Sequence, residues 1–113
     1  MQKSFSDAFH GIRDALRSEP NLRIHFLTSL AAIAGAIYFD FSAGEFAILS
    51  LTIFLVIALE FINTAIEKLS DIVHPKKSEK IRIIKDISAG VVLLGAVASI
   101  VVGCFLFIPK LFG

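Results

Sequence analysis

Polar side chains recur along residues 60–71 at intervals of three or four positions. The four are Glu60, Asn63, Glu67 and Asp71. At about 100° of rotation per residue, they fall within an arc of roughly 80° on one face of a helix. Carboxylate and amide oxygens in such a row suit Mg²⁺, which typically arrives in proteins with nucleotide phosphates. The spacing predicts a site for a metal–nucleotide complex. The alternative, that these side chains only join helices, fits one polar residue better than four.

Glu60 ends a long apolar run, whereas Glu67 and Asp71 lie in the polar sequence that follows. Glu60 comes fifteen residues after Glu45, or about 22 Å along a helix inside a hydrocarbon layer of about 30 Å. A charge at this depth is costly unless it is paired or hydrated. We therefore expect Glu60 near one membrane boundary, where its carboxylate is suited to act as a general base. The rest of the row then extends toward water.

Two further groups of polar residues precede the neighbouring apolar runs. They are Glu19, Asn21, Arg23 and His25 in the first group, and Lys85 and Asp86 in the second. At the same boundary they could supply a metal ligand, a cation for phosphates and polar contacts, although charges that flank a span usually only anchor it. The histidines at positions 10, 25 and 74 lack the spacing of metal ligands, and we expect them to be solvated or interfacial.

Composition indicates the elements that position these residues. The chain has 113 residues, of which 56% are hydrophobic, and a mean hydropathy of +0.80. A soluble domain of this size has too little interior to bury so much apolar surface. The net charge of +1 gives no reason to expect nucleic acid as a partner, and the single cysteine, Cys104, cannot form an internal disulfide. Residues 1–20 lack a continuous apolar core, so we expect no signal peptide there.

The apolar runs predict an all-α integral membrane protein with a single domain over residues 1–113. Three transmembrane helices are expected at residues 23–41, 45–70 and 84–108. The runs approach or exceed the length of about 20 residues that a bilayer requires. Three spans make a thin bundle, and small residues recur every four positions on the third, which favours a homo-oligomer.

An amphipathic surface helix is expected at residues 4–17, ahead of the first span. Apolar residues recur there at helical spacing, namely Phe5, Phe9, Ile12 and Leu16. Such a helix lies in the membrane interface or packs against its own bundle, and the pattern fits both. Pro20 predicts a break between this helix and the first span.

The distribution of Lys and Arg predicts the orientation. Of the eleven, four precede or open the first span and six lie between the second and third, whereas the link from Asp40 to Glu45 has none. By the positive-inside rule, the N-terminus and the second link lie in the cytoplasm and the C-terminus lies outside. The second link contains the breaker His74-Pro75 and the basic residues Lys76 and Lys77.

The polar row belongs to a longer motif, Glu60-Phe-Ile-Asn63-Thr-Ala-Ile-Glu67, followed by Asp71 and Lys85-Asp86. This motif resembles that of the prokaryotic diacylglycerol kinase family. The segment Glu19-Pro-Asn21-Leu-Arg23-Ile-His25 fits the same family, and the resemblance covers most of the chain. This chain differs from some members of that family at Lys76-Lys77-Ser78. An additional nucleotide-contacting arginine in a longer N-terminal helix is also expected to be missing.

The resemblance implies a homotrimeric lipid kinase of the bacterial inner membrane, with active sites shared between neighbouring subunits. It implies transfer of the γ-phosphate of ATP to the terminal hydroxyl of diacylglycerol, which gives phosphatidic acid. In this family pattern, Glu60 is the general base and contacts the lipid together with Asn21 and Arg23. Glu19 and Glu67 hold Mg²⁺. The nucleotide is positioned by Asn63, Asp71, Lys85 and Asp86.

Two other functions compete with this one. The family also contains undecaprenol kinases, which phosphorylate a polyprenol, and the sequence does not separate the two substrates. A subunit of a proton-coupled transporter is a third hypothesis, because intramembrane carboxylates also mark ion pathways. A transporter predicts a lone acid near the midplane, whereas Glu60 lies off-centre at the head of a polar row.

Overall fold

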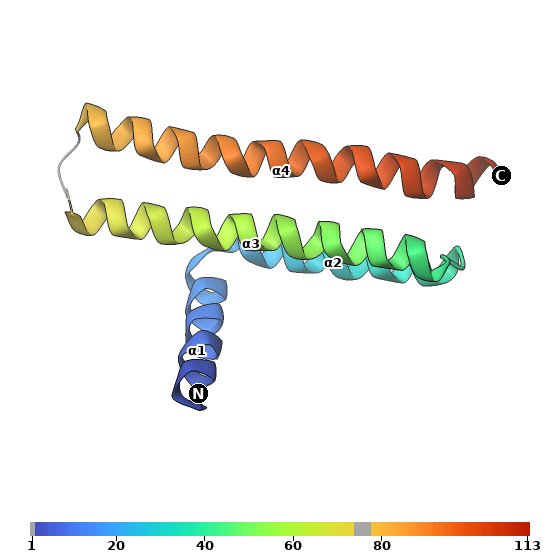
Figure 1. Cartoon of the computed structure of the whole chain (residues 1–113), viewed down its shortest axis with the longest axis horizontal. Coiled ribbons are helices and arrows are strands. Elements are labelled where there is room, and N and C mark those ends of the chain that lie inside the picture. The colour runs from blue at the N-terminus through green and yellow to red at the C-terminus, as the bar shows by residue number, and fades with distance from the viewer. Residues whose placement is uncertain (1, 74–77) are drawn as a thin grey trace.

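The chain folds into four α-helices in a computed structural model that describes residues 2–73 and 78–113. The helices are α1 (Gln2–Ser18), α2 (Pro20–Tyr38), α3 (Ala43–Val73) and α4 (Glu79–Phe112) (Figure 1). The predicted all-α class is confirmed. The breaker and the two lysines expected in the second link, residues 74–77, lie outside the described residues.

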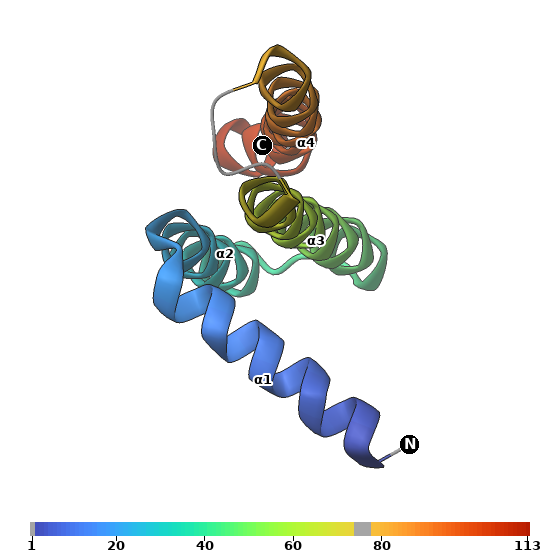
Figure 2. The same ribbon diagram turned by 90° about the vertical axis from the view of Figure 1, so that its left-hand side faces the viewer.

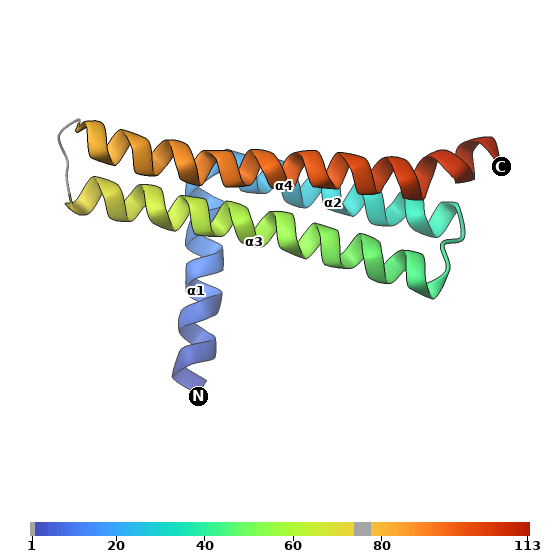
Figure 3. The same cartoon turned by 45° about the horizontal axis from the view of Figure 1, so that its top comes forward.

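Helices α2, α3 and α4 run side by side, and α1 crosses them at a steep angle (Figures 1 and 2). The most extensive contact is between α3 and α4, and α2 packs on α3 (Figure 3). Figure 1 also shows that α3 and α4 continue well past the point where α1 crosses and α2 begins. The bundle therefore has a three-helix part and a projecting two-helix part.

Helix lengths explain this shape. With 31 and 34 residues, α3 and α4 measure about 46 and 51 Å, which exceeds a hydrocarbon layer of about 30 Å. With 19 residues, α2 measures about 28 Å. If α2 spans the layer, one end of α3 and α4 must project beyond it. The polar row begins beside α2, at Glu60, and continues onto that end.

Two helices, α3 and α4, are long and apolar enough to cross a membrane on length and composition. Within their most apolar windows, 17% and 11% of the residues are buried, whereas the core helix of a soluble protein is mostly buried. Helix α2 opens with the polar residues Asn21, Arg23 and His25, which lower its average hydropathy. The third span therefore stays a prediction.

The break between α1 and α2 forms where Pro20 predicts it. Glu19 has an extended backbone with φ of −118° and ψ of 105°, and Pro20 begins α2. Proline suits this position because its fixed φ is helical and the first residues of a helix need no N–H partner. The break lets α1 leave the bundle at a steep angle, with Phe5 and Phe9 exposed, as an interfacial helix requires.

The apolar core gathers at the end opposite α1. It consists of Ala36, Phe41, Leu49 and Leu106, which come from α2, the α2–α3 turn, α3 and α4. A capping box starts α3, because the Ser42 amide donates to Glu45 Oε1 at 2.8 Å and the Glu45 amide donates to Ser42 Oγ at 3.2 Å. The polar row of α3, from Glu60 to Asp71, lies toward the other end of the bundle.

Candidate active site

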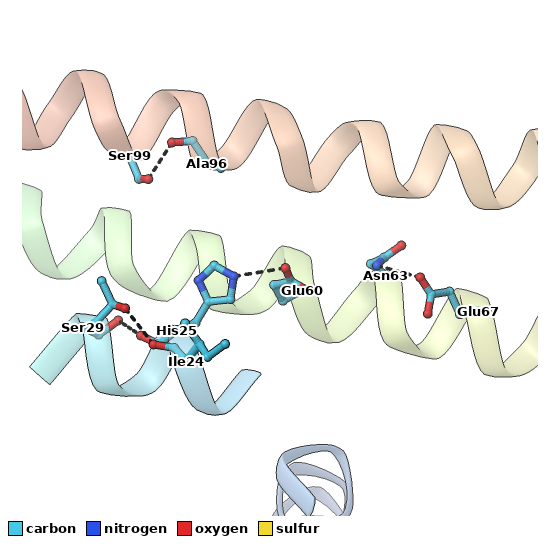
Figure 4. A network of polar contacts seen from close by, with 9 residues as sticks. Ile24, His25, Ser29, Glu60, Asn63, Glu67, Ala96 and Ser99 are labelled. Carbon is cyan, nitrogen blue, oxygen red and sulfur yellow. Dashed lines mark hydrogen bonds and ion pairs between the residues drawn. The ribbon is translucent and has the colours of Figure 1, made fainter. Parts of the chain in front are cut away.

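Glu60 is a buried carboxylate in α3, with 8% of its surface exposed. Val56 and Ile57 lie four and three positions earlier, so they share its helix face, and both are buried as well. Glu60 therefore points into the bundle. Its Oε1 lies 3.1 Å from Nε2 of His25 in α2, and Figure 4 shows the imidazole reaching across from α2 to α3.

This contact gives His25 a partner that the sequence analysis did not foresee, since it expected a solvated or interfacial histidine. The imidazole is half-buried and is the hydrogen-bond partner of the most deeply placed acid in the polar row. An ionised carboxylate only accepts hydrogen bonds, so Nε2 of His25 must donate. The pair thereby meets the requirement that a carboxylate near hydrocarbon be partnered.

Asn63 and Glu67 continue the row by one and two turns. The Asn63 amide nitrogen donates to Glu67 Oε1 at 3.1 Å (Figure 4). From α4, the Ser88 hydroxyl donates to the Asn63 carbonyl oxygen at 2.7 Å. Both ends of the amide are therefore engaged, one within α3 and the other on α4.

The projecting part carries the charged members of the predicted site. Lys85 Nζ donates to Asp71 Oδ1 at 2.5 Å, which ties α4 to α3 beyond the level of α1. Asp86 pairs instead with Arg82 in its own helix, at 2.7 Å, and Arg82 also pairs with Glu79. Lys85 is half-buried, whereas Asp71 and Asp86 are exposed, so an incoming anionic ligand can reach this cluster.

Helix α1 meets α3 at the level of the polar row. A groove of about 720 Å³ runs between them, lined by Gly11, Ala15 and Ser18 of α1 and by Phe61, Thr64 and Lys68 of α3. Two of these α3 residues flank Asn63 or Glu60 in sequence. The helix expected at the membrane interface and the polar row thus share one level of the bundle.

The residues predicted ahead of the first span lie at the junction of α1 and α2. Glu19 is half-buried and its side chain caps no helix, whereas Asn21 and Arg23 are exposed. In residues 2–73 and 78–113 of this single chain, no three His, Cys, Asp or Glu side chains gather as a metal site. The roles of Glu19 and Glu67 as metal ligands therefore stay predictions.

The structure brings two residues to the row that the sequence analysis did not assign to it. His25 had a weak signal, since it lies among apolar residues and no Asp, Glu, Lys or Arg follows it in α2. Ser88 had none, because a single serine in an apolar helix is common. The row contacts two neighbouring helices: Glu60 contacts α2, whereas Asn63 contacts α4.

A sequence profile described as Prokaryotic diacylglycerol kinase matches residues 6–107. The chain belongs to the prokaryotic diacylglycerol kinase family. A diacylglycerol kinase from Synechocystis sp. is 40% identical over 109 residues, and an undecaprenol kinase from Bacillus subtilis is 35% identical over 109 residues. Each comparison covers 96% of this chain; it covers 62% of the Synechocystis protein and 89% of the Bacillus protein.

Membership in the prokaryotic diacylglycerol kinase family confirms the resemblance drawn from the polar motif. The family consists of membrane-embedded lipid kinases, so ATP and a lipid alcohol are the substrates that membership implies. It favours the kinase hypothesis over the ion-transport hypothesis. The matched range contains every predicted site residue, from Glu19 to Asp86.

Proposed function

We propose that the protein is an ATP-dependent lipid kinase that phosphorylates the terminal hydroxyl of diacylglycerol to give phosphatidic acid. One observation carries this proposal: the buried Glu60 heads a row of polar side chains that continues onto the projecting part of α3 and α4. A lipid hydroxyl held at the interface and a nucleotide arriving from water can meet along such a row.

In the proposed reaction, the lipid oxygen attacks the γ-phosphorus and Glu60 takes the hydroxyl proton. A bond forms between the lipid oxygen and the phosphorus, and the bond from the phosphorus to the β–γ bridging oxygen breaks. ADP leaves with that electron pair. Such a transfer depends mainly on positioning and on charge stabilisation, which suits a site with few reactive side chains.

The nucleotide site in this proposal consists of Asn63, Asp71, Lys85 and Asp86. Lys85 supplies a positive charge toward phosphates, and its bond to Asp71 keeps it at the α3–α4 seam. Asn63, held by Ser88, presents a fixed amide beside Glu67. Asn21 and Arg23 begin α2 at the expected interface, where they would contact the polar part of the lipid.

The carboxylates present fit a magnesium ion. Protein sites usually hold Mg²⁺ through one or two carboxylates and complete its shell with phosphate oxygens and water. Glu67 engages one oxygen with Asn63, and Glu19 has no capping bond, so both could bind a cation. An ion held by these carboxylates would supply positive charge that offsets the negative charge developing during phosphoryl transfer.

The proposed setting is the bacterial inner membrane, with three spans, the N-terminus in the cytoplasm and the C-terminus outside. Charge distribution supports this orientation, and the steep angle of α1 supports an interfacial position for that helix. We propose a homotrimer in which neighbouring subunits share active sites. Open space around Gly90 on α4 supports close approach of another helix.

Undecaprenol is the second candidate substrate, and the Bacillus relative supports it because 89% of that protein is covered. Both lipids present a primary hydroxyl at the interface. The deciding experiment gives the purified protein γ-labelled ATP with diacylglycerol, undecaprenol and other lipid alcohols, and separates products by thin-layer chromatography. We expect diacylglycerol to give the highest kcat/KM. A preference for undecaprenol above about tenfold would assign the polyprenol instead, and no labelled lipid would reject the kinase proposal.

A further inference from the structure

We propose that His25 is a positioning residue that holds the Glu60 carboxylate in the orientation needed to accept the lipid proton. The inference rests on the proposed role of Glu60. It adds a residue of α2, 35 positions from Glu60 in sequence, as a direct partner of the proposed general base.

The geometry is that of a carboxylate held by one oxygen. Nε2 of His25 lies 3.1 Å from Oε1 of Glu60, and the two side chains are 30% and 11% exposed. In the ionised form that a general base requires, Glu60 only accepts, so Nε2 is then the donor. Among the described residues, no other side chain or backbone group forms a hydrogen bond with the Glu60 carboxylate. None of their buried polar side-chain atoms lacks a partner, so Oε2 retains accessible surface. One oxygen is therefore paired with His25, and the other keeps accessible surface at which we propose the substrate hydroxyl binds.

The backbone of α2 at His25 receives an additional hydrogen bond. The Ser29 hydroxyl donates to the backbone carbonyl of His25 at 2.7 Å, which supports the second turn of α2. A groove of about 170 Å³ between α2, α3 and α4 begins at His25 and is lined further along by Leu49, Val56 and Ser99. Of the described residues lining this groove, His25 alone can ionise. Among the described residues of α2, His25 is the one whose side chain lies within hydrogen-bond distance of the Glu60 carboxylate.

A positioning role has a distinct kinetic consequence. A glutamate side chain has several freely rotating bonds, and a hydrogen bond from a neighbouring helix selects one orientation. Proton transfer requires the acceptor oxygen within hydrogen-bond reach of the hydroxyl, so a mobile carboxylate lowers kcat. Binding of ATP does not depend on that orientation, and the lipid keeps its proposed contacts with Asn21 and Arg23. Loss of His25 should therefore change kcat far more than either KM.

The test compares two substitutions at position 25 in the full-length protein. Glutamine carries an amide N–H at about the reach of the imidazole Nε2, whereas methionine has similar bulk and no donor. We expect His25→Met to lower kcat about 10- to 100-fold with both KM values within about twofold, and His25→Gln to remain within about threefold of wild type. His10→Met, at an exposed position of α1, is the matched control and should leave kcat unchanged.

Coupling to Glu60 provides a second kinetic readout. In a Glu60→Gln background, His25→Met should cause no further loss, because residues that act as a unit are not additive. Full kcat in His25→Met, or an equal fall in His25→Gln and His25→Met, would overturn the positioning role. If wild-type protein phosphorylates no lipid alcohol, the proposed function fails instead.

Imidazole nitrogen resonances test the contact without any assay of activity. In protein labelled with ¹⁵N-histidine, Glu60→Gln should shift the ring signals of His25 and leave those of His10 in place. This measurement needs no substitution at position 25, so it decides the matter even if His25→Met fails to fold. Unchanged His25 signals would overturn the proposal.

Discussion

Ser88 in α4 donates a hydrogen bond to Oδ1 of Asn63 in α3 across 2.7 Å. The carboxylate of Glu67 can only accept, so it draws the amide nitrogen of Asn63, which donates at 3.1 Å. The hydroxyl and the carboxylate together determine which way the amide faces. A serine without chemistry of its own thus orients a residue that we assign to the nucleotide.

Ser88→Ala tests that assignment. Removal of one neutral hydrogen bond is worth about 0.5–1.5 kcal/mol, so we expect KM for ATP to rise about 2- to 10-fold with little change in KM for lipid. Ser99→Ala is the control, because Ser99 donates to the carbonyl of Ala96 in its own helix. An equal effect of the two substitutions on KM for ATP would contradict a role of Ser88 at the nucleotide.

Glu60→Gln tests the general base. The amide keeps the shape of the side chain but cannot take a proton, and general-base catalysis typically contributes about 10²- to 10⁴-fold. We expect kcat to fall by that factor, measured with saturating lipid and ATP, while the dissociation constant for ATP stays within about twofold. Glu60→Asp, which keeps the carboxylate, should retain more activity than Glu60→Gln. A variant with an amide and near-normal kcat would exclude Glu60 as the base.

Glu67→Gln tests the metal assignment. Loss of one carboxylate ligand weakens the hold on a divalent cation, so the Mg²⁺ concentration for half-maximal activity should rise at least about tenfold at fixed ATP. Removal of Mg²⁺ with a chelator should abolish activity. Glu79→Gln makes the same charge change at an exposed position of α4 and should leave the Mg²⁺ dependence as it is. A parallel shift in both variants would point to general electrostatics instead.

Lys110→Met tests whether the end of the bundle opposite α1 contributes to stability and not to catalysis. Lys110 Nζ lies 3.1 Å from Glu45 Oε1 and 5.7 Å from the centre of the Phe41 ring, at the end of the bundle opposite α1. Both charged side chains keep about a third of their surface in contact with solvent, which screens the pair. We therefore expect unfolding in detergent to become easier by only about 0.5–1.5 kcal/mol, with kcat unchanged.

A double-mutant cycle with Glu45→Gln isolates the ion pair in that experiment. Unfolding is measured by circular dichroism in detergent, and lipid phosphorylation is measured on the same samples. A fall in kcat without a loss of stability would show that the far end of the bundle communicates with the site.

Local sequence determined the helices and the order of groups along them. Pro20 ends one helix and starts the next because its ring fixes φ and removes an N–H. The interval from Glu60 to Asp71 determines their shared face, because an α-helix turns about 100° per residue whatever surrounds it. The part of the family motif from Glu60 to Glu67 was recognisable for the same reason, since it lies within one helix.

Tertiary structure decided which helix each member of the row faces. Spacing along α3 sets angles around its own axis, but the packing of α2 and α4 determines that Glu60 meets His25 and that Asn63 meets Ser88. These partners lie 35 and 25 positions away, and no local preference links residues so distant. Contacts of this kind arise only when helices pack, so only the folded chain could reveal that Glu60 is held from α2.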